Sequence, residues 1–276
     1  MESISVVIPT YNRREVLVRT LNAFADQDIQ LTYEVIVCDD GSSDDTTDTV
    51  MLMTRDSSFE LRYLRHERAG WRLAATRNMG IAAAKGSLIV FSDDDIIPPP
   101  SYLSAHYEAH HTPRTVTVGY NYALLSDKER GCTLLGQDVR DREFAAFPEL
   151  ARPLWSLMSG GNFSVEHALL DEVGHFDERF QGWGVEDGEL AYRLARVGAR
   201  FVLEKKAYGW HQYNPNPVSH RLQHAQGLRP DFTSHLKNVS LFRSTYPEDM
   251  QLQLQLHRVM LRLELEQSRV LRETAR

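Results

Sequence analysis

Short apolar runs alternate with amphipathic segments along the first 91 residues, and this alternation limits the folds open to the chain. The apolar runs at 3–8, 33–38, 61–64 and 88–91 predict strands, the first of them ended by Pro9. The segments at 14–25, 45–55 and 74–84 predict helices. Strands that alternate with helices imply a mostly parallel sheet flanked by helices, which places the chain in the α/β class.

The later part of the chain continues this pattern less regularly. It predicts helices at 102–110, 168–173 and 186–197, and extended segments at 115–122, 159–165 and 199–203. Residues 126–143 are charged and show no period, so we expect a long excursion or lid there. The character changes after Pro217, and residues 248–274 predict one long helix.

This long helix carries an apolar side, formed by Leu252, Leu256, Val259, Leu263 and Val270. The plainest interpretation is packing against the body of the protein. Contact with a membrane surface and formation of a homodimer stay open as alternatives, although three glutamates balance the arginines of the helix.

Composition narrows the class of protein. A formal net charge of −7 without a basic run argues against nucleic-acid binding. Cys38 and Cys132 are the only cysteines, so neither a disulfide framework nor a zinc site is expected, and a reducing cytosol fits best. The chain shows no basic, apolar leader and no apolar stretch of about 18 residues, so we expect a soluble cytoplasmic protein.

Three aspartates, Asp93, Asp94 and Asp95, directly follow the apolar run at 88–91 and form an acidic triplet. Two carboxylates about 4 Å apart repel by roughly 4 kcal/mol at an effective dielectric of 20, so a divalent cation would relieve the crowding. Oxygen ligands suit Mg²⁺ or Mn²⁺. In an extended chain Asp93 and Asp95 would face one side and Asp94 the other. A solvated acidic turn is the alternative.

Two more polar clusters, at 9–12 and 39–42, follow predicted strands. Ligands bind at the carboxyl ends of the strands in open α/β sheets, so we expect these clusters and the acidic triplet to form one site. The G-x-G-x-x-G pattern of dinucleotide-binding folds is missing from the first turn.

The order of these motifs resembles that of family 2 glycosyltransferases. The runs are VVIPTYNR at 6–13, VCDDGSSD at 37–44, ATRNMG at 75–80, SDDD at 92–95, FDERF at 176–180 and GWGVED at 182–187, and the last two also look like an acceptor motif of galactosyltransferases. The resemblance implies a GT-A fold over 1–216, with a nucleotide-sugar-binding half at 1–122 and an acceptor-binding half at 123–216, followed by a C-terminal helical extension at 217–276. It also implies a metal-dependent nucleotide-sugar donor and inversion at the anomeric carbon.

Roles on the donor side follow from the same resemblance. Pro9 and Tyr11 would line the nucleoside pocket, and Asp39 would accept the N–H of uracil. Arg77 would sit near the diphosphate, and Asn78 would steady that turn. The plainer alternatives are a helix-capping role for Asp39 and a solvated helix position for Arg77.

The resemblance also assigns the acidic triplet. Asp95 matches the principal metal ligand, Asp93 the residue that reaches the ribose or the metal, and Asp94 a donor-side residue that supports the turn. His211 stands where related enzymes often place a third metal ligand, with a core or rim histidine as the alternative. Mn²⁺ or Mg²⁺ is the implied cofactor.

On the acceptor side, Asp187 matches the catalytic base, and Glu186 would bind an acceptor hydroxyl. Trp183 would face a sugar ring, and Gly161 lies on the same side; a helix-dipole role for the two acids and a core position for Trp183 are the alternatives. The sequence thus predicts a metal-dependent inverting glycosyltransferase that moves a hexose, with a UDP-sugar favoured, to a glycan or other hydroxyl acceptor. A lipid-carrier acceptor and a non-catalytic carbohydrate- or nucleotide-binding role remain as rivals.

Overall fold

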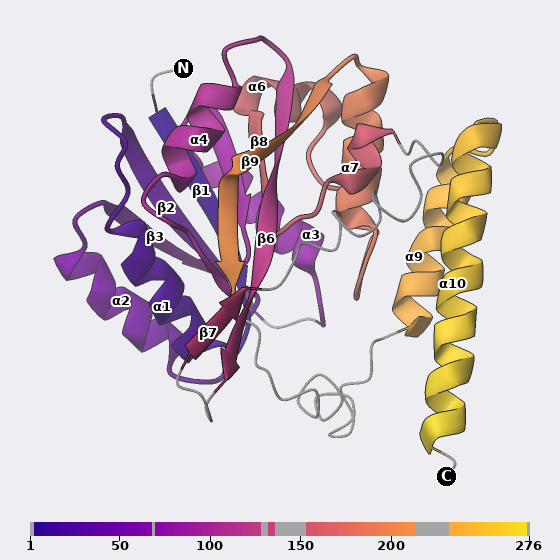
Figure 1. Ribbon diagram of the computed structural model, residues 1–276, viewed down its shortest axis with the longest axis horizontal. Helices are drawn as coiled ribbons and strands as arrows, with labels where there is room; N and C mark the ends of the chain where they lie inside the picture. The colour runs from indigo at the N-terminus through magenta and orange to yellow at the C-terminus, as the bar shows by residue number, and fades with distance from the viewer. Residues whose placement is uncertain (1–2, 68–69, 128–131, 136–152, 213–231, 275–276) are drawn as a thin grey trace.

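A nine-stranded mixed sheet runs through the centre of the protein (Figure 1). The computed structural model describes residues 3–67, 70–127, 132–135, 153–212 and 232–274. The strands are β1 (Ser3–Thr10), β2 (Thr32–Asp39), β3 (Glu60–Arg65), β4 (Leu88–Ser92), β5 (Ile96–Ile97), β6 (Thr115–Asp127), β7 (Cys132–Leu135), β8 (Asn162–Glu166) and β9 (Arg200–His211). Their order is β3-β2-β1-β4-β8-β6-β9-β5, with β7 paired to β6. Strands β1 to β4 are parallel, β8 reverses the direction, and β6 and β9 are parallel to each other, so the predicted α/β class is confirmed.

Helices cover both faces of this sheet. They are α1 (Arg14–Phe24), α2 (Thr46–Asp56), α3 (Leu73–Ala83), α4 (Tyr102–Ala109), α6 (His167–Val173) and α7 (Glu186–Arg196), with a 3₁₀ turn η1 (Leu154–Leu157). Val6 packs in a cluster with α1, α2 and α4, whereas its neighbour Val7 packs in a cluster with α3, α6 and α7. Because β1 is buried on both faces, its residues 6–8 are apolar in succession rather than in alternation.

Several strands extend beyond their predicted ends, among them β6, which was predicted at 115–122 and continues to Asp127. Strand β1 can include Pro9 because its pairing with β4 stops at Val7. The proline lacks an N–H, but no hydrogen bond to β4 is required from it at that point. Strand β9 continues from the predicted 199–203 to His211, although Lys205 and Lys206 are exposed in its middle. The extension matters because it carries His211 to the carboxyl edge of β4.

The short strand β5 and the β6–β7 pairing were not predicted. Residues 126–127 and 132–135 belong to this antiparallel pair, so part of the expected excursion at 126–143 is regular structure, and its remainder lies outside the described residues. The expected boundary at 216/217 also lies outside them.

Two C-terminal helices, α9 (Phe232–Thr245) and α10 (Met250–Thr274), lie side by side beyond α7 (Figure 1). Their apolar residues form a third cluster with Phe180 and Tyr192 of the body. Leu252, Leu256 and Leu263 are buried in it and Val259 packs against it, so the described part of the apolar side predicted for α10 packs within the protein. None of the helices in the described ranges has the length and hydropathy of a membrane-spanning segment.

Candidate active site

The polar clusters that follow β1, β2 and β4 meet at one edge of the sheet. Thr10, at the end of β1, donates its hydroxyl hydrogen bond to Asp94 Oδ2 over 2.8 Å. Its carbonyl accepts a bond from the N–H of Asp40 after β2, over 3.0 Å. Parallel strands end together, so these side chains converge as the sequence indicates.

The acidic triplet forms a turn rather than an extended segment. The N–H of Ile96 donates to the carbonyl of Asp93 over 3.2 Å, so the alternation expected for an extended chain does not apply. Asp94 is 3% exposed, and Thr20 donates to its carbonyl over 2.8 Å. Burial and the neighbouring Asp95 charge raise the pKa of Asp94 to about 7, against the opposing effect of Arg13. Asp94 therefore lies buried within the turn, and its place on the donor side stays a prediction.

Arg13 bridges two members of the triplet, and the sequence analysis gave it no role. Its guanidinium nitrogens lie 3.0 Å from Asp94 Oδ1 and 2.6 Å from Asp95 Oδ2. His211 Nε2 lies 3.3 Å from Asp95 Oδ2. Burial alone would raise the pKa of Asp95, but His211 and Arg13 together lower it to about 2. The sequence could have indicated Arg13 through its position at the end of the VVIPTYNR motif, shortly after the first strand.

The residues predicted as metal ligands fit a cation that is shared with a substrate. Asp95 Oδ1 is buried and accepts no hydrogen bond from the part of the chain that the structure describes. The Asp93 side chain is 39% exposed, and His211 lies against Asp95. The described residues contain no preformed group of three acidic, histidine or cysteine ligands. Mg²⁺ and similar ions usually take one or two carboxylates plus substrate phosphates, which agrees with such a partial site.

Asp39 is fully buried and bonded within the protein. Its Oδ1 accepts from the N–H and the hydroxyl of Ser42, at 2.7 and 2.8 Å, and its Oδ2 accepts from the Tyr63 hydroxyl at 2.5 Å. Burial and this bond raise the pKa of Tyr63. Asp39 thus stabilises the turn after β2, where the sequence left capping open. Pro9 is buried beside this turn, while Tyr11 is 37% exposed; contact of these residues with a nucleoside stays a prediction.

Arg77 of α3 connects the acidic triplet to the N-terminus of α7. It is 2% exposed, and its guanidinium lies 3.0 Å from Glu186 Oε1 and 3.3 Å from Asp93 Oδ1. The carboxylates outweigh burial and raise its pKa. The guanidinium that was predicted to face a diphosphate is therefore paired with two carboxylates. Its burial rules out a solvated helix position for Arg77.

Two glycines allow this close packing. A Cβ atom at Gly160 would lie 2.2 Å from Arg77 Nη2, and one at Gly161 would lie 2.4 Å from Asp93 Oδ2. Backbone can approach the charged groups closely only where no side chain intervenes. Gly161, predicted on the acceptor side, thus lies against the acidic triplet, between the two halves of the site.

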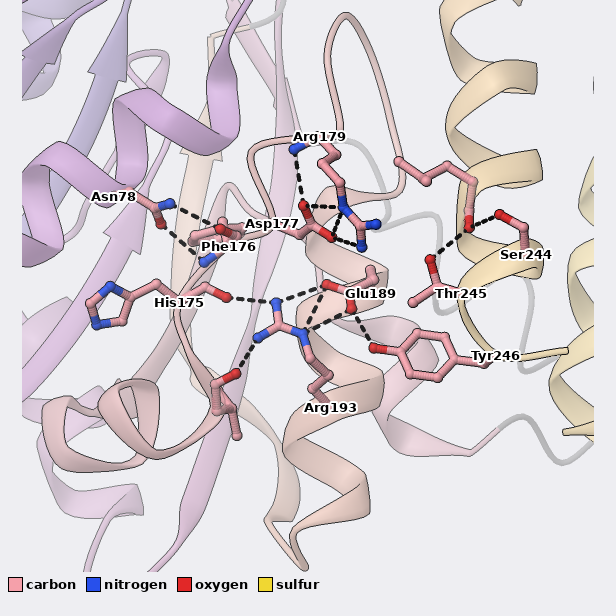
Figure 2. Close-up of polar contacts among 12 residues, drawn as sticks. Asn78, His175, Phe176, Asp177, Arg179, Glu189, Arg193, Ser244, Thr245 and Tyr246 are labelled. Atoms are coloured by element: carbon pink, nitrogen blue, oxygen red, sulfur yellow. Dashed lines mark hydrogen bonds and ion pairs between the residues drawn. The ribbon is translucent and has the colours of Figure 1, made fainter. Parts of the chain in front are cut away.

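Asn78, the residue after Arg77, holds the segment that leads to α7. Its side-chain amide exchanges two hydrogen bonds with the backbone of Phe176, at 2.9 and 3.0 Å (Figure 2). Asp177 in turn accepts from the backbone and guanidinium of Arg179. The FDERF run therefore builds a turn that fixes the path toward residues 182–187, and the contacts of Asn78 here are structural.

The two predicted catalytic acids at the start of α7 differ in exposure. Glu186 is 6% exposed, and burial together with the Asp187 charge raises its pKa to about 7 against the effect of Arg77. Asp187 is more accessible, and its carboxylate accepts from the N–H groups of Gly160, at 2.9 Å, and Gly188, at 2.7 Å. Trp183 is 41% exposed, so it is not a core residue.

Family models match most of the chain. Residues 5–168 match the model described as glycosyl transferase family 2, and residues 144–214 match the N-terminal domain of galactosyltransferase. Among curated proteins, the validoxylamine A glucosyltransferase of Streptomyces hygroscopicus subsp. jinggangensis is 34% identical over 75% of this chain and 54% of its own length. A chondroitin synthase of Escherichia coli is 30% identical over 78% of this chain and 35% of its own length. The chain thus spans about half or less of these two relatives.

Solved structures agree with the fold. A mannosyltransferase from Pyrobaculum calidifontis, in complex with GDP-Man and Mn²⁺, matches with a TM-score of 0.60 at 21% identity, over 83% of this chain and 63% of that one. TarS from S. aureus, in complex with UDP-GlcNAc, matches with a TM-score of 0.59 at 20% identity, over 89% of this chain and 73% of that one. At such identities the likeness shows the fold, and the predicted GT-A fold is confirmed.

Proposed function

The chain belongs to glycosyl transferase family 2, and on that premise we propose that it transfers a sugar from a nucleotide sugar to a hydroxyl group of an acceptor. One observation carries the proposal: Arg77 joins the acidic triplet to the Glu186 and Asp187 pair at a single edge of the sheet. A donor diphosphate at the triplet would therefore lie across from a carboxylate that can accept a proton. The names of the relatives, a glucosyltransferase and a chondroitin synthase, support a sugar-transfer role.

A divalent cation, Mn²⁺ or Mg²⁺, completes the donor side in this proposal. Asp95 would hold it through the buried Oδ1, with Asp93 and His211 beside it. When bound, the cation supplies charge that offsets the departing diphosphate. The mannosyltransferase described with GDP-Man and Mn²⁺ supports the choice of metal class.

Asp187 is the base of the proposed inverting reaction. It takes the proton of the acceptor hydroxyl while that oxygen bonds to the anomeric carbon, and the bond from this carbon to the diphosphate breaks on the opposite side. Its exposure and its two backbone hydrogen bonds support this role, because they hold an accessible carboxylate in one orientation. Glu186 is paired with Arg77 and buried, so it suits the acceptor-hydroxyl role less well.

The catalytic test uses two near-isosteric variants. Asp187→Asn and Asp95→Asn should still unfold cooperatively, at a lower temperature than the wild type because each loses contacts of a charged carboxylate, and should lose transfer from a nucleotide sugar in the presence of Mn²⁺. Transfer at the wild-type rate in either variant would refute the assigned roles. A wild-type protein that binds nucleotide sugars but neither transfers nor hydrolyses them would favour the non-catalytic binding role.

The donor is testable by ligand-dependent stability. Binding to the folded state alone raises apparent stability, by about 2.7 kcal/mol at a hundredfold excess over Kd. UDP-hexoses with Mn²⁺ should raise the unfolding temperature, and GDP-sugars should raise it less. The reverse order would contradict the proposed uridine donor.

A lipid-linked acceptor is a second candidate, favoured by α10. Met250, Leu254 and Leu261 are exposed on this helix, outside the packed side. One relative, 33% identical over 66% of this chain, is named as a glucosyltransferase acting on an undecaprenol-linked glycan. Co-sedimentation with anionic vesicles would support this candidate, and full recovery in the supernatant would contradict it. Sedimentation velocity tests the alternative use of α10 in a homodimer.

A further inference from the structure

The first turns of α9 lie against residues 182–185, which we call the acceptor loop. The N–H of Trp183 donates to Ser234 Oγ over 3.0 Å, and Asn238 Nδ2 donates to the carbonyl of Gly184 over 3.0 Å. The rings of Trp183 and His235 meet edge to face, with centroids 4.8 Å apart and an interplanar angle of 82°. A helix more than 45 residues further along the chain thus contacts both the backbone and the aromatic ring of this loop.

The acceptor loop has an unusual backbone that needs support from its surroundings. Gly182, Gly184 and Val185 have φ angles of 78°, 101° and 64°, all in the left-handed region. This region is rare for a β-branched residue and costs on the order of 1–3 kcal/mol, so it persists only where neighbours hold it. A Cβ atom at Gly184 would lie 3.0 Å from the His235 ring, so α9 and the loop are in close contact.

The other end of the same helix is tied to α7. The Tyr246 hydroxyl, just after α9, donates to Glu189 Oε1 over 2.7 Å (Figure 2). Glu189 is 1% exposed and also accepts from Arg193, whose guanidinium donates to the carbonyls of Val173 and His175. Helix α9 therefore contacts both the acceptor loop and the helix that begins with Glu186 and Asp187.

We propose that α9 is part of the acceptor site, with Asn238 as the residue that positions the acceptor loop and His235 as a wall beside Trp183. This rests on the proposed function. Asn238 is 4% exposed and its amide reaches the loop carbonyl, so it acts through the backbone. Trp183 keeps 41% of its surface exposed, so an indole face of fixed orientation is available for a sugar ring of the acceptor.

Hydrogen exchange tests the positioning without any reaction. Asn238→Leu keeps the size of the side chain and removes the donor, while Lys237→Ala changes the exposed neighbour on the same helix. Amides of the acceptor loop should exchange about tenfold faster in Asn238→Leu, as expected for the loss of one buried hydrogen bond, and unchanged in Lys237→Ala. Asn238→Gln, which retains an amide, should recover part of the protection. Unchanged loop exchange in Asn238→Leu overturns the positioning role.

Steady-state kinetics test the acceptor assignment. In Asn238→Leu the acceptor KM should rise about tenfold, with the donor Kd and the rate of donor hydrolysis in the absence of acceptor unchanged. A parallel loss of donor binding and acceptor use would indicate a general structural role and would overturn the proposal. If the wild-type protein transfers no sugar, the proposed function fails along with the acceptor assignment, whereas the exchange comparison still decides whether Asn238 orders the loop.

Discussion

Replacing Arg77 by methionine should destabilise the protein in a pH-dependent manner. The side chain of Arg77 is 2% exposed and pairs with Glu186 and Asp93. Removing one partner of a buried ion pair costs about 3–5 kcal/mol. The arm to Asp93 adds at most about 1 kcal/mol, since that carboxylate is 39% exposed and screened by solvent.

The pH dependence follows from the pKa of Glu186. This pKa is raised to about 7 in the folded protein, from an ordinary value of 4.5. A raised folded-state pKa gives stability that is fully present below the unfolded value and is lost as pH rises through the folded value. Without Arg77 the pKa of Glu186 rises further, so the variant continues to lose stability above pH 7 while the wild type does not. At about 1.4 kcal/mol per pH unit, the difference between the two proteins should be about 2 kcal/mol larger at pH 8.5 than at pH 6.

Urea unfolding monitored by tryptophan fluorescence at the two pH values measures this difference. The double variant Arg77→Met/Glu186→Gln provides the control, because it lacks the Glu186 carboxylate and leaves only Asp93 without its Arg77 partner. It should lose most of the pH-dependent part and regain stability relative to Arg77→Met at pH 8.5. An equal destabilisation of Arg77→Met at both pH values, or an undiminished pH slope in the double variant, would refute the reasoning.

Two further predictions concern the packing around the site. His106 and His110 are hydrogen-bonded to Ser164 in the core, and burial lowers their pKa values to about 3 and about 4. The free energy of unfolding should therefore fall as the pH drops below about 6.5, the unfolded-state pKa of histidine. The expected slope is up to about 1.4 kcal/mol per histidine and pH unit. The slope from urea titrations should be shallower in His106→Gln/His110→Gln, and an equal slope would contradict the assignment. Gly160→Ala should lower the unfolding temperature, because its Cβ would lie 2.2 Å from Arg77, whereas Gly188→Ala, with open space around its Cβ, should be tolerated. Equal effects of the two substitutions would show that the approach to Arg77 is not tight.

The elements that could be predicted are those in which several buried apolar residues follow one another in the sequence. Strands β1, β2 and β4 contain uninterrupted apolar runs at 6–8, 35–38 and 88–91, and their carboxyl ends gather the polar clusters as expected. Strand β9 was predicted short because Lys205 and Lys206 interrupt its apolar pattern, although pairing with β6 extends it to His211. Such pairing joins residues about 85 positions apart, which a local pattern does not record.

The roles predicted for the site residues stay predictions, whereas their contacts are now described. Asp94 lies buried in a turn, and the exposure of Trp183 removes the core position that the sequence had left open. The partners of Arg77 were not foreseen, because a guanidinium fork fits carboxylates as well as phosphates and only the fold decides which groups arrive. Asn238 was missed because nothing in its neighbourhood of the sequence links α9 to the acceptor loop.

The charge balance of this edge explains why both arginines lie where they do. The acidic triplet and the Glu186 and Asp187 pair together place five carboxylates around Arg13 and Arg77. The raised pKa values of Asp94 and Glu186, both about 7, remove part of that negative charge near neutral pH. Burial also raises the pKa of Asp93, and Asp95 raises the pKa of His211 against the effect of burial. A nucleotide sugar would add a diphosphate to this edge, and the proposed divalent cation would offset that charge. Asp95, with a pKa of about 2 and an oxygen without a hydrogen bond among the described residues, is the group best suited to hold it.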